Sequence, residues 1–245
     1  MVRIMKNTIL RFEEQDVYEQ AKEFFIQICG FREMKSGSEK MLALGLAARD
    51  RGVASIDIRA VVSAYDADVF RGDAVVIGDA AFDCPAFERV DRDCVEKVYA
   101  FLMTVGECAS RPEDGISAQV FADMWGTAYA DAALETLETY IKQEMAREFP
   151  GRLEQTLFLS DSFGPGLYGM NVSLTKELFG LMDAESVGMR VNDSGMMLPV
   201  KSCSGFYFAV TDDKDLPQLK CEDCGGNVLS CGFCRFRPER TRQER

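Results

Sequence analysis

A single long helical pattern constrains this chain more than any other feature of its sequence. The pattern runs over residues 117–149, with Gly126 as a candidate break, and Pro150-Gly151 stops it. The chain has 245 residues, of which 47% are hydrophobic and only seven are proline, so it can bury a core. A chain of 245 residues is expected to form one large domain or two small ones.

Shorter helical patterns flank the long one. Apolar residues recur at helical spacing over residues 13–29, where Gly30 is placed to end the helix, and a second helix is expected over 38–51, closed by Gly52. Asp91 is interpreted as the N-cap of a helix through Tyr99 and Met103. A short amphipathic helix is expected over residues 174–182.

Strand patterns are short and scattered. Residues 53–78 are rich in β-branched side chains, and further strands are expected over 156–159, 189–191, 196–198 and 206–210. Helices are thus expected to cluster in the first part of the chain and strands in the second, without regular βαβ alternation. This pattern predicts an α+β fold with an antiparallel sheet and argues against a doubly wound nucleotide-binding fold.

The composition excludes several classes of function. The chain contains no histidine, which removes Ser-His-Asp hydrolases, His-ligated zinc enzymes and any histidine general base. The formal charge of −12 argues against nucleic acid as a partner, since that affinity comes from clustered Lys and Arg. No apolar signal-peptide core and no stretch of 18 apolar residues is present, so neither export nor a membrane span is expected. We expect a cytoplasmic protein.

Four of the nine cysteines lie in one cluster near the carboxyl terminus, Cys221, Cys224, Cys231 and Cys234. Two Cys-x-x-Cys turns six residues apart can bring four sulfurs around one centre, which suits tetrahedral zinc or an iron–sulfur cluster. Two disulfides or four free thiols are the alternative. The following residues, 235–245, contain five arginines and two glutamates. They are interpreted as a solvated tail or as a contact for an acidic partner.

Two further segments carry candidate binding groups. The loop over residues 162–169 contains Gly164, Pro165 and Gly166, and its glycines would let backbone amides approach a ligand closely. On the long helix, Asp131 and Glu135 lie four residues apart and share a face, where they repel unless a cation offsets them. A simple connecting turn and a solvated acidic face are the alternatives.

Together these segments resemble the activation domain of vitamin B12-dependent methionine synthase, which binds S-adenosylmethionine during reductive reactivation. The resemblance covers the carboxyl-terminal half best. It rests on four segments in the family's order, namely 130–140 (Ala-Asp-x-x-x-Glu with a following Tyr), Gly164-Pro165-Gly166, 178–189 (a helix-to-strand step) and 196–205 (a Met-x-Pro strand leading to Ser-x-Ser-Gly).

The resemblance implies helices around a curved antiparallel sheet and a site for S-adenosylmethionine. Glu135, with Asp131, would face the cationic end of the ligand, and Gly164 falls where a backbone group meets it. Ser162 stands where the family has Arg, so amides near Gly164 and Gly166 would have to hold the ligand carboxylate. Leu167 stands at the family's Tyr, and adjacent Tyr168 is the candidate to replace it.

The implied function is an activation subunit that supports reductive remethylation of a separate cobalamin-dependent methionine synthase or related corrinoid methyltransferase. Cobalamin would be carried by that partner, and the cysteine cluster or the arginine tail would meet an electron donor. The expected organisation is an amino-terminal region of the same domain (1–115), an activation-domain-like core (116–215), and the cysteine cluster with the basic tail (216–245). A corrinoid-protein interaction module that does not bind S-adenosylmethionine, or a zinc-stabilised structural subunit, is the alternative.

Overall fold

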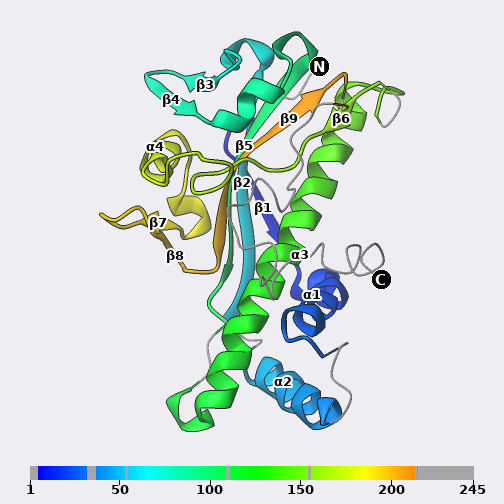
Figure 1. Ribbon diagram of the computed structural model, residues 1–245, viewed down its shortest axis with the longest axis vertical. Coiled ribbons are helices and arrows are strands. Elements are labelled where there is room, and N and C mark those ends of the chain that lie inside the picture. The colour runs from blue at the N-terminus through cyan, green and yellow to red at the C-terminus, as the bar shows by residue number, and fades with distance from the viewer. Residues whose placement is uncertain are drawn as a thin grey trace, which may run out of the picture.

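The computed structural model describes residues 5–31, 37–52, 55–108, 111–153, 156–212 and 214. Four α-helices and nine strands are assigned within these ranges (Figure 1). In chain order they are β1 (Thr8–Phe12), α1 (Glu14–Ile28), α2 (Ser38–Gly52), β2 (Ile56–Asp66), β3 (Ala74–Ile77), β4 (Ala80–Asp83), β5 (Val95–Gly106), α3 (Ile116–Glu148), β6 (Phe158–Leu159), α4 (Leu174–Leu181), β7 (Arg190–Val191), β8 (Met197–Leu198) and β9 (Ser202–Val210). Single 3-10 turns include η4 (Arg92–Cys94) and η6 (Glu185–Val187).

The architecture is α+β, as predicted. Five strands form one curled antiparallel sheet in the order β1-β2-β5-β9-β6, and β3-β4 and β7-β8 form two small hairpins. Helices α1, α2 and α3 lie on one side of the main sheet, while α4 and the hairpins lie on the other (Figure 1). The sheet takes strands from both sides of residue 116, so the expected amino-terminal region and core share it.

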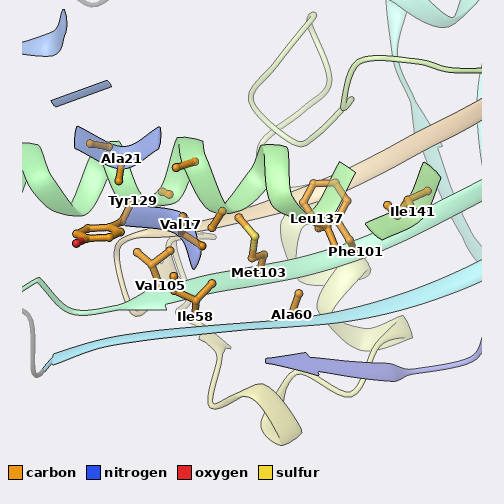
Figure 2. Packing of buried hydrophobic residues seen from close by; sticks show 14 of the residues in the cluster. Val17, Ala21, Ile58, Ala60, Phe101, Met103, Val105, Tyr129, Leu137 and Ile141 are labelled. Carbon is orange, nitrogen blue, oxygen red and sulfur yellow. The ribbon is translucent and has the colours of Figure 1, made fainter. Parts of the chain in front are cut away.

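Each face of the sheet has its own core. On the helical side, Leu137 and Ile141 of α3 are fully buried against Phe101 and Met103 of β5 (Figure 2). On the other side, Phe163, Phe206 and Phe208 join a cluster of aromatic rings with centroids about 5 to 6 Å apart. The central strands β5 and β9 are therefore apolar on both faces.

Two secondary-structure predictions are wrong. The helix expected from Asp91 through Met103 is one 3-10 turn, which the Asp91 carboxylate does cap through the Asp93 N–H, followed by strand β5. A strand buried on both faces has no alternation, so its apolar run cannot be told from a buried helix by periodicity. The expected clustering of helices before strands also fails, because β1 and β5, which were not expected as strands, fall in the first half together with β2.

The candidate break in the long helix is absent as well. Helix α3 continues through Gly126, and a methyl group there would lie 2.9 Å from the Lys201 side chain. Gly126 thus admits the Lys201 stem, whose ammonium reaches Asp123 at 2.8 Å and Thr127 at 3.0 Å. The absence of a side chain at Gly126 therefore allows α3 to contact the start of β9.

Candidate functional site: an acidic helix face beside strand β9

An acidic stripe on α3 faces the last long strand of the sheet. Asp131, Glu135 and Glu138 lie at positions i, i+4 and i+7 of the helix, so they share one face. Burial raises the pKa of the Cys203 thiol to about 12, and the negative charge of Asp131 contributes to that shift. Since Cys203 lies on β9, the charge of Asp131 acts on this strand.

The other end of the stripe reaches a buried tyrosine on the same strand. Burial raises the pKa of the Tyr207 phenol, and the charges of Glu138 and Asp161 raise it further, while a hydrogen bond with Ser162 opposes them. Cys203 and Tyr207 are four residues apart on β9, or about 13 Å. Glu135 lies between Asp131 and Glu138 on the helix, and Ser162 acts on the same strand through Tyr207.

The glycine-rich loop is attached directly to this strand. The Ser160 N–H donates to the Phe208 carbonyl at 2.9 Å, and Phe163 exchanges two backbone hydrogen bonds with Phe206, at 2.8 and 2.6 Å. A methyl group at Gly164 would overlap the Ser204 carbonyl oxygen, and one at Gly205 would overlap the Phe163 carbonyl oxygen. Both glycines are therefore needed for the close approach of the two backbones.

The remaining loop residues lie in three different surroundings. Pro165 is half-buried, and Gly166 is exposed with a φ of +88°. The Gly166 N–H already donates to the Met170 carbonyl at 2.9 Å, whereas the Gly164 N–H has no acceptor within the part of the chain that the structure describes. Gly164 is accordingly the better of the two predicted amide donors for a ligand.

The two residues after Gly166 point in opposite directions. Leu167 is 42% exposed, whereas Tyr168 is only 7% exposed and its ring lies 5.0 Å from that of Phe163 in the second core. The Tyr168 backbone has a φ of +52°, which turns its side chain inward. Its proposed contact with a ligand remains a prediction, and the second core already accounts for its position.

The residues present fit a cationic ligand better than an anionic one. The stripe and Asp161 supply carboxylates, Ser162, a residue that is 9% exposed, supplies a hydroxyl, and Gly164 supplies an amide. A sulfonium and an ammonium group would be stabilised by the acids. A ligand carboxylate would have to rely on neutral donors, because position 162 lacks the guanidinium of the family pattern.

The predicted metal ligands all belong to the carboxyl-terminal cysteine cluster. Cys221, Cys224, Cys231 and Cys234 lie outside the described residues, and so does the basic tail. Within the described ranges, no group of three or more Cys, Asp or Glu side chains is arranged to hold a metal ion. The five cysteines in those ranges are free thiols.

A separate small pocket lies at the other half of α3. It encloses about 420 Å³ and is lined by Ile28, Gln119, Val120, Asp123, Met124 and Thr127. Asp123 is engaged by Lys201, and Cys29 contacts the Met124 sulfur at 3.3 Å. None of the predicted site residues lines this pocket.

Sequence reasoning missed four residues of the site, namely Glu138, Asp161, Cys203 and Tyr207. Glu138 forms an ion pair with Lys142 at 2.9 Å. Its position seven residues after Asp131 was the available signal that it also belongs to the stripe. Cys203 and Tyr207 can be recognised only once the packing of α3 against β9 is known, and no local sequence pattern specifies that packing.

The comparisons with known proteins concern the fold. The sequence matches no protein-family profile and no curated protein. The structure is similar to that described as "Crystal Structure of the MetH Reactivation Domain bound to AdoHcy", with a TM-score of 0.56 at 16% sequence identity. The similarity covers 91% of this chain and 85% of that chain. The chain thus has the fold of a MetH reactivation domain over nearly its whole length. In the described residues, no helix is long and apolar enough to cross a membrane.

Proposed function

We propose that this chain is an S-adenosylmethionine-binding activation subunit for a separate corrinoid methyltransferase, such as a cobalamin-dependent methionine synthase. The fold is the first support, because the similar reactivation domain is bound to AdoHcy. The observation that carries the proposal is the acidic stripe, because the charges of Asp131 and Glu138 act on Cys203 and Tyr207 of β9, the strand to which the Ser162 loop is hydrogen-bonded.

Each group would have a distinct part in binding. Glu135, with Asp131, would stabilise the sulfonium and ammonium charges, and the Gly164 amide with the Ser162 hydroxyl would hold the carboxylate. The bound sulfonium supplies an activated methyl group. The chain itself would position that group and neutralise its charge, while the corrinoid and the electron come from partner proteins, the electron donor meeting the cysteine cluster or the arginine tail.

Calorimetric titration tests the proposal. S-adenosylmethionine should bind about tenfold more tightly than AdoHcy, because only the former has the sulfonium charge that the acids would stabilise. Glu135→Gln should remove most of this preference while leaving AdoHcy affinity nearly unchanged. Glu19→Gln on α1, whose side chain is 81% exposed, is the control and should bind both ligands as the wild type does.

The missing arginine at position 162 favours a second candidate, a corrinoid-protein interaction module that does not bind S-adenosylmethionine. That candidate predicts no measurable heat with either ligand. It also predicts that the chain associates with its corrinoid protein equally well in the presence and absence of S-adenosylmethionine. Binding of both nucleosides with no effect of Glu135→Gln would contradict the proposed site.

A further inference from the structure

Two arginines lie directly opposite each other on neighbouring strands of the main sheet. Arg11 of β1 is the register partner of Arg59 of β2. Arg59 is opposite Thr104 of β5, which is opposite Ser202 of β9. Side chains of opposed residues share a face, so these four form one polar row across four strands. The row lies on the face away from α1–α3, because Val61, two residues beyond Arg59, belongs to the second core.

The hydroxyl groups of Thr104 and Ser202 already donate to the carbonyls of Lys201 and Pro199, so the donors left for a ligand in this row are those of the two arginines. The Thr104 hydroxyl accepts from the Gly106 N–H at 3.1 Å, and the Ser202 hydroxyl donates to the Pro199 carbonyl at 2.6 Å. Arg11 is exposed and makes no ion pair with any residue of the described ranges. A ligand at this row would therefore be recognised by guanidinium groups.

The Arg59 guanidinium is held in place but incompletely paired. Its Nη2 lies 3.1 Å from an Asp57 carboxylate oxygen, and a methyl group at Gly188 would lie 2.9 Å from its Nη1. The absence of a side chain at Gly188 thus lets the turn after η6 pack on the guanidinium. The Arg59 Nε is buried and has no hydrogen-bond partner among the described residues. A buried donor of this kind indicates a missing acceptor, such as a water or an anion.

We propose that Arg11 and Arg59 form a binding site for a phosphate-type anion, either free phosphate or the phosphate group of a larger ligand. Two like charges at directly opposed positions repel each other, and within the described residues Asp57 is the one carboxylate that an ion pair joins to either of them. A phosphate dianion offsets both charges, and its oxygens match the two guanidinium forks. The site is independent of the acidic stripe and of the function proposed for it.

Phosphate titration of the full-length protein tests this site. Binding is followed by calorimetry with inorganic phosphate, a nucleoside 5′-monophosphate and acetate, at matched ionic strength. Both phosphates should bind and acetate should not. Arg11→Gln should weaken phosphate binding about tenfold or more, since it removes one bidentate charge-assisted contact. Much tighter binding of the monophosphate would identify a larger ligand as the source of the phosphate group.

Two more variants test the second arginine of the site and provide a control. Arg59→Lys retains the charge but loses the fork, so it should also weaken binding while the fold, checked by circular dichroism, is kept. Arg71→Gln, an exposed arginine away from the row, is the control and should bind like the wild type. Equal affinity in Arg11→Gln and wild type, or no preference of the wild type for phosphate over acetate, overturns the proposal. Arg11 would then be an edge-strand charge that only opposes sheet pairing.

Discussion

Substitution of Gly205 by alanine tests whether the loop and β9 must approach as closely as the structure has them. The new methyl group would overlap the Phe163 carbonyl oxygen, so the two segments would have to separate by roughly 1 Å. The two Phe163–Phe206 hydrogen bonds, at 2.8 and 2.6 Å, would then exceed hydrogen-bonding distance. Their loss together with the displaced packing of the Phe163 ring should lower the free energy of unfolding by about 3 kcal/mol.

Urea unfolding followed by the fluorescence of Trp125 measures this change. Trp125 is the one tryptophan of the chain and is fully buried, so its emission reports loss of the core. Gly180→Ala is the matched control, because a methyl group on this exposed face of α4 meets no atom within 4 Å. It should raise the free energy of unfolding by about 0.5–1 kcal/mol. A loss below 1 kcal/mol in Gly205→Ala would refute the close approach.

Three further predictions concern ligand, pH and metal. Ser162→Arg should tighten S-adenosylmethionine binding by about tenfold or more, because it adds a bidentate donor for the ligand carboxylate. Calorimetry measures this change, and an unchanged affinity would mean that the carboxylate lies elsewhere. Stability should stay flat from pH 6 to 8, where no histidine titrates, and fall as pH rises above about 9. The thiol pKa of Cys203, raised from 9.0 to about 12, keeps that group neutral in the folded state while the unfolded chain ionises. Urea unfolding at pH 8 to 10 should show a smaller fall in Cys203→Ala. Anaerobically purified protein should contain close to one zinc or about four irons per chain, held by Cys221, Cys224, Cys231 and Cys234; less than a tenth of either metal would reject this centre.

The fold class followed from the sequence because its strongest signals are local. The long helix and its stop at Pro150-Gly151 are present as α3, and α1 and α2 begin and end within a residue or two of their predicted bounds. Strand β5 was missed because Val95 to Gly106 is apolar on both faces, and only the two cores on either side of the sheet make it a strand.

The site was predictable only in part, for a related reason. Asp131 and Glu135 share a helix face, and helical spacing alone is enough to see that. Which strand this face meets depends on how α3 crosses the sheet, so Cys203 and Tyr207 could not be found. Gly164 was singled out for ligand approach, and the structure adds a packing reason, the backbone of Ser204 directly behind it. Sequence pattern cannot separate these two uses of one glycine.

Hydrogen exchange with and without S-adenosylmethionine locates the bound ligand on the chain. We predict slower amide exchange in peptides that cover residues 131–138, 160–166 and 203–207, with no change around Ile28 and Thr127, which line the separate pocket. At a subsaturating concentration of S-adenosylmethionine, Glu135→Gln should show clearly less protection of these peptides than the wild type. Protection confined to the separate pocket, or no protection anywhere at saturating S-adenosylmethionine, would contradict the account.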